Sequence, residues 1–181
     1  VRTLPKALGL TDSDCYLHTA SISFSSSVRQ LLVPMSIGAS VVVASPAQMR
    51  DPLSLFELIQ RESVTVVDLV PSFWRGCLLA LNSTSRENER RLLDNKLRVL
   101  LSASEPLPVS IPREMASKFG PGVRLINMYG QTETSGIISV SPIEPATPAE
   151  SGIVSIGRGI ENARIYIVDE NMRLVPDGEQ G

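Results

Sequence analysis

The chain has 181 residues and a formal net charge of −2, with 43% hydrophobic and 20% charged residues. This length and composition fit a globular domain with a substantial core, and the lack of a basic excess argues against binding to nucleic acid. No apolar run approaches the roughly 20 residues needed to span a bilayer. We therefore expect a cytoplasmic protein with no nucleic-acid partner and no membrane partner.

Short apolar runs alternate with segments of helical spacing over most of the chain. Strands are predicted at residues 15–19, 40–44, 65–70, 97–101 and 123–128, and helices at 25–35, from 52 onward, 71–81, within 82–95 and at 108–119. Ser25, Ser26 and Ser27 are expected to cap the first helix through side-chain oxygens, and Pro34 to kink it or end it early. The strand at 40–44 shows no alternation, which predicts burial on both faces.

This alternation predicts an α/β fold in which a parallel doubly wound sheet is flanked by helices, over residues 1–136. After Thr134 the composition changes, and short strands at 137–140, 156, 163–168 and 173–175 lie between turn residues. They predict a partial antiparallel β region at 137–181, the start of a small β-barrel-like subdomain that the chain does not complete. The first residues have the character of a helix end and the last of a turn, so we expect a piece of a longer polypeptide.

The strand at 123–128 is followed by Tyr129, Gly130, Gln131, Thr132 and Glu133. In an open α/β sheet, ligands bind beyond the carboxyl ends of the strands. An aromatic ring can stack on a base, a glycine permits close backbone approach, hydroxyls can bind phosphate, and a carboxylate can bind Mg²⁺. The segment therefore predicts a nucleotide site.

Two charged residues lie in otherwise apolar surroundings. Asp68 interrupts a buried strand, and a buried carboxylate needs a partner or an opening to a cleft. Arg29 lies in a helix whose other residues are expected to face a core. Taken singly, Asp68 could equally be a hydrogen-bonded acid in the core, and Arg29 is expected to be a solvated side chain. Together, they point to one polar pocket.

Several familiar catalytic patterns are missing from the sequence. His18 is the single histidine, and there is no Gly-x-Ser-x-Gly elbow and no Cys or His cluster suited to zinc. There is also no Gly-x-x-x-x-Gly-Lys-Ser/Thr loop and no Gly-x-Gly-x-x-Gly. The residues alone thus predict an α/β domain with a nucleotide-like site and without a complete catalytic apparatus.

Residues 127–134, Asn-Met-Tyr-Gly-Gln-Thr-Glu-Thr, resemble the Asn-x-Tyr-Gly-x-Thr-Glu motif of the adenylate-forming (AMP-binding) superfamily. This superfamily includes acyl-CoA synthetases, luciferases and the adenylation domains of nonribosomal peptide synthetases. Residues 24–28 resemble its Phe-Asp-x-Ser-Val segment, 102–107 its Gly-Glu-Pro-Leu-type turn, and 156–179 the peptide-synthetase version of the region that follows. Four stretches in order, over nearly the whole chain, resemble the central fragment of a peptide-synthetase adenylation domain.

The resemblance implies a role for each matching residue of the nucleotide site. Tyr129 would stack on adenine, Asn127 would hydrogen-bond its amino group, Thr132 would hold the α-phosphate, and Glu133 would bind Mg²⁺. Thr132 and Glu133 are the implied catalytic residues. The implied ATP-binding residues are Ser104, Glu105, Pro106, Asn127, Met128, Tyr129, Gly130, Gln131 and Thr132.

The resemblance also implies a reaction. A ligase of secondary metabolism would activate a carboxylic acid with ATP and Mg²⁺, and pass it to phosphopantetheine on a carrier (thiolation) domain beside condensation or other synthetase domains. The implied acid-binding residues are Phe24, Ser25, Ser26, Arg29, Asp68, Leu101, Ala103, Met128, Gly136 and Ile137. The family's phosphate loop, ribose-binding Asp and catalytic Lys fall outside residues 1–181, so we expect this piece alone to be inactive.

One position departs from the family pattern. In domains that activate α-amino acids, the residue after the Phe is an Asp that pairs with the substrate ammonium, whereas here it is Ser25. Either the acid lacks an α-amine, which we favour slightly, or Asp68 binds a displaced ammonium. Arg29 would then bind a second carboxylate or neutralise Asp68.

Two other functions are compatible with these residues. A stand-alone acyl-CoA or fatty-acyl-AMP ligase is favoured by Gln131, where proline is commoner, and disfavoured by the region from residue 156 onward. A non-catalytic nucleotide-binding module would have Tyr129 in its core and Glu133 as a solvated turn residue.

Overall fold

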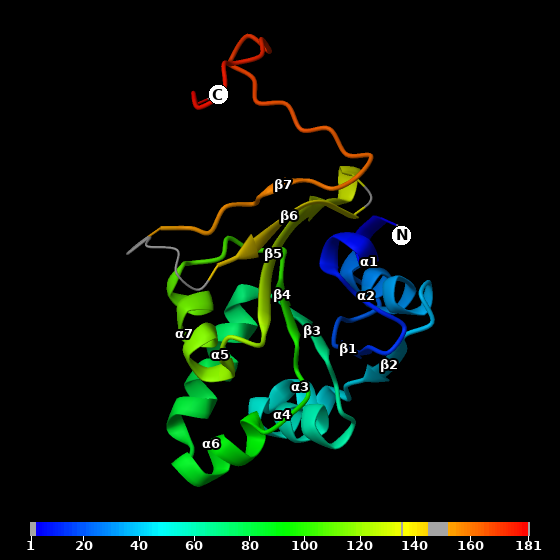
Figure 1. Ribbon diagram of the computed structural model, residues 1–181, viewed down its shortest axis with the longest axis vertical. Coiled ribbons are helices and arrows are strands. Elements are labelled where there is room, and N and C mark those ends of the chain that lie inside the picture. Colours follow the sequence, from blue (N-terminus) through cyan, green and yellow to red (C-terminus); the bar gives the residue numbers. More distant parts are fainter. Residues whose placement is uncertain (1–2, 135, 145–151, 181) are drawn as a thin grey trace.

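The computed structural model describes residues 3–134, 136–144 and 152–180 (Figure 1). Within these ranges one sheet has the strand order β2-β1-β3-β4-β5-β6-β7. Strands β1 to β5 pair in parallel, and β6 and β7 are antiparallel to their neighbours. The strands are β1 (Cys15–His18), β2 (Ser40–Val43), β3 (Val66–Leu69), β4 (Val99–Ser102), β5 (Arg124–Gln131), β6 (Gly136–Ile143) and β7 (Arg158–Gly159).

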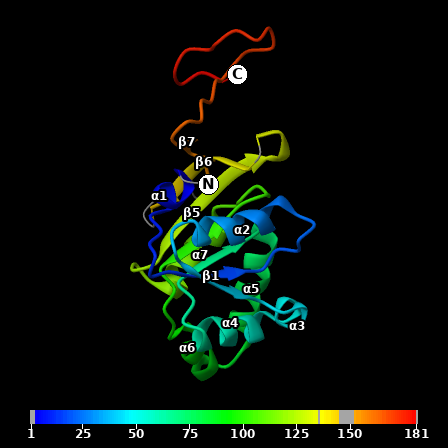
Figure 2. The ribbon, with the colours of Figure 1, turned by 90° about the vertical axis from the view of Figure 1, so that its right-hand side faces the viewer.

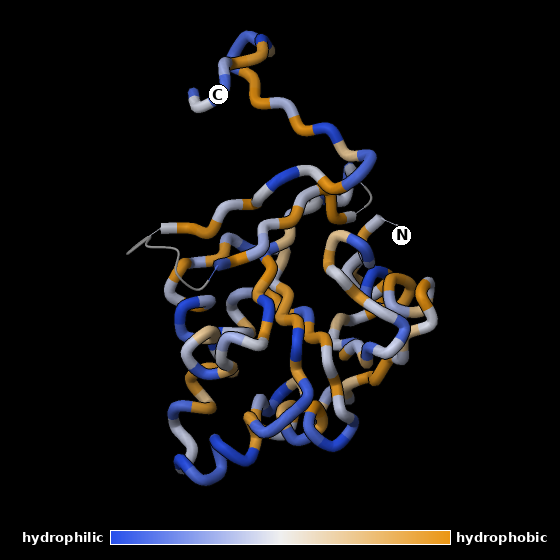
Figure 3. Tube along the Cα trace, in the orientation of Figure 1, coloured by the Kyte–Doolittle hydropathy of each residue, from blue (hydrophilic) through white to orange (hydrophobic). Residues whose placement is uncertain are grey.

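Helices cover both faces of the sheet. They are α1 (Thr3–Leu8), α2 (Ser25–Met35), α3 (Pro46–Arg50), α4 (Pro52–Arg61), α5 (Pro71–Ser83), α6 (Arg86–Leu93) and α7 (Ser110–Phe119), with a 3₁₀ turn η1 at Thr132–Thr134. Alternate residues of the central parallel strands contribute to two cores, one on each face: Tyr16 packs with α1 and α2, and Leu17 with α4 to α7. Apolar residues accordingly gather along β3, β4 and β5 at the centre (Figure 3). The predicted α/β fold with a parallel sheet and a partial antiparallel region is confirmed.

The strand order creates a crevice between β1 and β3. From β1 the chain crosses to β2 on one side, and later returns to β3 on the other. At such a reversal, the connections that follow the two strands run in opposite directions from the carboxyl ends. Open α/β sheets bind ligands in the crevice that this creates.

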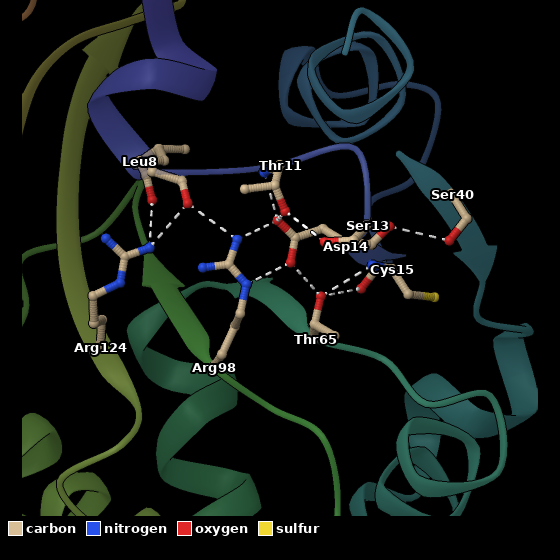
Figure 4. Close-up of polar contacts among 10 residues, drawn as sticks. Leu8, Thr11, Ser13, Asp14, Cys15, Ser40, Thr65, Arg98 and Arg124 are labelled. Carbon is tan, nitrogen blue, oxygen red and sulfur yellow. Dashed lines mark hydrogen bonds and ion pairs between the residues drawn. The ribbon is translucent and has the colours of Figure 1, made fainter. Parts of the chain in front are cut away.

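A polar network holds the opposite edge, at the amino ends of the strands (Figure 4). Asp14 accepts hydrogen bonds from Nε of Arg98 at 2.6 Å, from Oγ1 of Thr65 at 2.7 Å and from N of Thr11 at 2.8 Å. Arg98 and Arg124 also donate to backbone carbonyls just after α1 and at its end. Burial alone would raise the pKa of Asp14, but its bonds to Arg98, Thr11 and Thr65 lower it from 3.8 to about 2.

The start of α2 differs from the prediction. Phe24 is the N-cap, and no side chain caps the helix. The three serines lie inside the first turn, and Oγ of Ser27 instead lies 3.1 Å from Nε2 of His18. The helix does end at Met35, one residue after Pro34, as expected.

The prediction of two buried faces was wrong for β2. It is the edge strand, and Val43 is 64% exposed. Helix α3 was not predicted at all, although Pro46 follows Ser45, which forms a capping box with Gln48.

The predicted strands after β6 are reduced to short pairings, of which one joins the predicted segments 163–168 and 173–175: Val175 N donates to the carbonyl of Ile167 at 3.2 Å. Apart from β7, the described residues there contribute isolated bridges, Pro108–Ile153 and Val168–Leu174, and the segment after β7 extends away from the sheet (Figures 1 and 2). Tyr166 is 60% exposed, because no described strand covers it. The division at residues 136 and 137 stays a prediction, although β6 continues the sheet of β5.

No helix in the described residues meets the length and apolarity of a membrane span; the longest, α5, has 13 residues.

Candidate functional site

Two neighbouring cavities lie at the carboxyl ends of the parallel strands. The β1–β3 cavity, of about 460 Å³, is lined by residues from the loop after β1, from α2 and from β3 that include Arg29 and Asp68. The β4–β5 cavity, of about 320 Å³, is lined by residues from the ends of β4 and β5 that include Tyr129. Ser104 and Glu105, in the turn after β4, line both. The site is thus two compartments with a common wall.

An ion pair forms the polar part of the β1–β3 cavity. Nε and Nη2 of Arg29 donate to Oδ2 of Asp68 at 3.1 and 2.7 Å, and the hydroxyl of Tyr16 donates to the same oxygen at 3.2 Å. Their side chains are buried, at 12% exposure for Arg29 and 3% for Asp68. Burial lowers the pKa of Arg29, but the charge and hydrogen bonds of Asp68, together with Tyr16, outweigh burial, so this pKa is raised. Burial also raises the pKa of Tyr16. Arg29 is therefore a cation that neutralises Asp68, and Tyr16 a neutral donor.

Gln30 fastens α2 to the ends of β1 and β3. Its Oε1 accepts from the backbone N of Thr19 at 2.8 Å and of Ala20 at 3.0 Å, and its Nε2 donates to the carbonyl of Asp68 at 2.9 Å. Sequence reasoning missed both Gln30 and Tyr16. The signal available was a polar group amid apolar neighbours, but their shared partner Asp68 lies 38 residues from Gln30 and 52 from Tyr16.

Half of the predicted acid-binding residues meet in the β1–β3 cavity: Phe24, Ser26, Arg29, Asp68 and Ala103. The others lie elsewhere: Ser25 is exposed at the start of α2, Leu101 is in the core, Met128 lines the β4–β5 cavity, and Gly136 and Ile137 are half-buried in β6. The cavity also has apolar walls that were not predicted, from Met49, Leu69, Val70 and Phe73.

Most of the predicted ATP-binding residues line the β4–β5 cavity: Ser104, Glu105, Pro106, Asn127, Met128, Tyr129 and Gly130. Tyr129 is 36% exposed. Nδ2 of Asn127 donates to the carbonyl of Ser155 at 3.0 Å, which leaves its amide oxygen as an acceptor. Gln131 and Thr132 lie past the cavity, in the last residue of β5 and in η1.

The turn between the cavities is held by a bond that sequence reasoning did not find. Glu105 accepts from the backbone N of Ser72 at 2.9 Å and from its Oγ at 2.8 Å. Ser72 is the second residue of α5, so the carboxylate also faces the positive end of that helix. Ser104 adopts a left-handed φ of 74°, which costs energy for a residue with a side chain. Glu105 holds the turn in this form.

Gly130 permits a tight bulge where β5 meets β6. The pairing register shifts between Tyr129 and Gly130, and a Cβ on Gly130 would lie 2.1 Å from the carbonyl oxygen of Gly136. Beyond it, Oγ1 of Thr134 donates to the carbonyl of Gln131 at 2.9 Å. These contacts fix the loop that carries residues 132 and 133.

Thr132 and Glu133 are exposed in η1 and line neither cavity. No group of three or more carboxylate, His or Cys side chains in the described residues is arranged to hold a metal ion. One carboxylate is nevertheless a fitting donor set for Mg²⁺, which usually binds through one or two carboxylates together with phosphate oxygens and water.

Comparison with known proteins identifies what this chain is similar to. A family model described as AMP-binding enzyme matches residues 1–181. The hybrid PKS-NRPS synthetase poxE of Penicillium oxalicum is 31% identical over 175 residues, covering 93% of this chain and 4% of that protein. The beta-alanyl-bioamine nonribosomal peptide synthetase ebony of Drosophila melanogaster is 31% identical over 163 residues, covering 89% of this chain and 18% of that protein.

A solved structure agrees with these relatives. The nonribosomal peptide synthetase FmoA3, in its alpha-methyl-L-serine-AMP bound form, is 27% identical with a TM-score of 0.84, covering 97% of this chain and 19% of that chain. This chain therefore spans less than a fifth of the length of each of these three proteins.

Proposed function

The chain belongs to the AMP-binding enzyme family, and from that premise we propose that it is the central part of an adenylation domain. In the longer protein it would activate a carboxylic acid with Mg-ATP to an acyl-AMP. The acyl group would then pass to the phosphopantetheine thiol of a carrier domain. Its peptide-synthetase relatives support this assembly.

One observation carries the proposal: two cavities of different character share a wall. The β4–β5 cavity has an aromatic ring, an amide acceptor and a turn that opposes them, which suits adenine. The β1–β3 cavity has a neutralised ion pair and apolar walls, which suit an organic acid. Two substrates bound on either side of Ser104 and Glu105 would meet at that wall, and such positioning is a major source of catalysis.

The chemistry follows from this placement. A carboxylate oxygen of the acid attacks the α-phosphorus, the bond from that phosphorus to the bridging oxygen breaks, and pyrophosphate leaves with the electron pair. The protein forms no covalent bond. Thr132 would hold the α-phosphate, and Glu133 would hold Mg²⁺, which when bound offsets the phosphate charge. In the second step the thiol sulfur attacks the acyl carbon, releasing AMP and a proton.

ATP–pyrophosphate exchange by the longer protein that carries this chain tests the proposal. Exchange that depends on an added acid, and that falls at least about 100-fold in Glu133→Gln, a loss of the size found when a charge-stabilising group is removed, is the expected result. Residues 1–181 alone should give no exchange. A non-catalytic module would instead bind Mg-ATP without exchange, and a stand-alone ligase would load coenzyme A rather than a carrier.

A further inference from the structure

We infer that the β1–β3 cavity takes an acid that bears a neutral oxygen, a hydroxyl or keto group, next to its carboxylate, and rejects the analogue that bears an ammonium. This inference rests on the proposed function for the identity of the site. It assigns Arg29 as the residue that sets this preference.

The first step concerns Asp68, whose charge is already balanced inside the protein. Oδ2 accepts two hydrogen bonds from Arg29 and one from Tyr16. An ammonium entering the cavity would have to displace Arg29 or sit beside its positive charge. Asp68 therefore does not act as a counter-ion for a substrate amine.

The second step concerns Glu105, the other carboxylate that lines the cavity. Both of its oxygens accept from Ser72 at the start of α5. Withdrawing it would leave the left-handed turn at Ser104 without this support. Among the lining residues, neither negative group is available, and an ammonium without a partner carries a large desolvation cost.

The third step concerns the N–H donors of Arg29 that do not bind Asp68. A guanidinium has five N–H donors, and two of them bind Asp68. Arg29 also interacts with the side chain of Tyr16, and it lines the cavity. Its remaining N–H groups suit a hydroxyl or keto oxygen. A second carboxylate fits less well, because Asp68 already neutralises the positive charge of Arg29.

The apolar walls complete the fit. Phe24, Leu69, Val70 and Phe73 line the same cavity and give the rest of the acid an apolar surrounding. An uncharged group bound by Arg29 leaves no charge unpaired in this setting.

A matched series of acids on one skeleton tests the inference in the longer protein. Phenyllactate, phenylpyruvate, phenylalanine, benzylmalonate and 3-phenylpropionate differ only in the group next to the carboxylate. The same series on the shorter skeletons of lactate and 2-hydroxyisovalerate covers smaller acids. On the preferred skeleton, the hydroxy or keto acid should exceed the amino acid at least tenfold in kcat/KM for exchange, and should also exceed the dicarboxylate and the unsubstituted acid.

Variants separate the role of Arg29 from general damage. Arg29→Met frees Asp68, so the ratio of amino acid to hydroxy acid should rise at least tenfold. In the double variant R29M/D68N the ratio should not rise, because position 68 then carries no carboxylate that could pair with an ammonium. Arg29→Lys keeps the charge and loses the fork of donors, so it should still reject the amine while kcat/KM for the hydroxy acid falls severalfold. Melting curves show which variants fold. If Arg29→Met does not fold, the result for Arg29→Lys tests the inference.

Calorimetric binding of the same acids keeps the two proposals distinguishable. If hydroxy acids bind most tightly but no acid supports exchange, the proposed activation fails and the cavity assignment stands. If amino acids give the fastest exchange, activation stands and the inference is overturned. If no acid of the series binds, the inference is overturned as well.

Discussion

At the amino ends of the strands Asp14 is paired with Arg98, and at the carboxyl ends Asp68 is paired with Arg29. Both acids are almost fully buried, at 2% and 3%. The Asp14 carboxylate is held by protein partners from the α1–β1 connection, by Thr65 and by Arg98 just before β4 (Figure 4). The side chain of Arg98 is 33% exposed, and this pair lines neither cavity. The Asp68 pair has a side that opens to a cavity.

The difference shows what decides the use of a buried ion pair. Desolvation makes such pairs poor sources of net stability unless further hydrogen bonds satisfy them. The Asp14 network meets that condition and joins segments far apart in sequence, so we expect it to act on stability. Arg29 keeps unused donors that face a cavity, so we expect its pair to act on recognition.

The largest expected effect is on stability, from Asp14→Ala. It leaves Arg98 without its carboxylate and removes the acceptor for Thr11 and Thr65, so the free energy of unfolding should fall by about 3 kcal/mol. Chemical unfolding measures this. Asp12→Ala, at an exposed position of the same turn, is the matched control and should stay within about 0.5 kcal/mol. Equal losses in the two variants would contradict the structural role of the network.

Sequence reasoning found one of these pairs and not the other. Asp68 stood out because it interrupts an apolar strand, and Arg29 because its helix neighbours are apolar. Asp14 lies in a polar turn, where an acid is ordinary, and Arg98 lies 84 residues away. A local pattern can show that a charge is out of place, but it does not show which distant residue satisfies it.

The same limit separates the parts of the fold that were predicted from those that were not. The parallel strands β3, β4 and β5 follow from apolar runs whose burial is decided locally. The exposure of β2 depends on its place at the sheet edge, and the strands after β6, reduced to short pairings, depend on neighbours. At the site, the motif around Tyr129 was visible, whereas Gln30 and Ser72 act through contacts that only the fold creates.

The second prediction uses pH to isolate the Asp14 network. The pKa of Asp14 is about 2 in the folded protein, against 3.8 as its ordinary value. Its contribution is therefore complete above about pH 3.8 and is lost as the pH falls toward 2. The loss should amount to about 2 kcal/mol. Unfolding between pH 6 and 2 should show a slope that Asp14→Asn reduces, and an unchanged slope in that variant would contradict the assignment.

A third prediction concerns the carboxyl edge, where backbone packing matters as well as charge. In Gly130→Ala the added Cβ would meet the carbonyl of Gly136, so the bulge must open, at a cost of about 1–3 kcal/mol. Affinity for Mg-ATP, measured by calorimetry, should fall with it, because Tyr129 and residues 132–133 flank the bulge. Gly122→Ala is the control, since nothing lies within 4 Å of its added Cβ and its backbone is not left-handed. An unchanged affinity for Mg-ATP in Gly130→Ala would contradict a role of the bulge in nucleotide binding.

The smallest expected effect comes from Tyr16→Phe, which tests whether a contact of the Asp68 pair acts on stability or on recognition. The variant removes one donor to Asp68, at 3.2 Å, and keeps the ring that packs in the core, so stability should fall by about 1 kcal/mol. Arg29 still neutralises Asp68 through two bonds, so the preference between hydroxy and amino acids should change less than about threefold, within roughly 0.7 kcal/mol. A tenfold gain in amino-acid exchange would mean that the phenol, and not the guanidinium, keeps Asp68 from acting as a counter-ion. The recognition assigned to Arg29 would then belong to the Tyr16 hydroxyl, which bonds the same oxygen of Asp68.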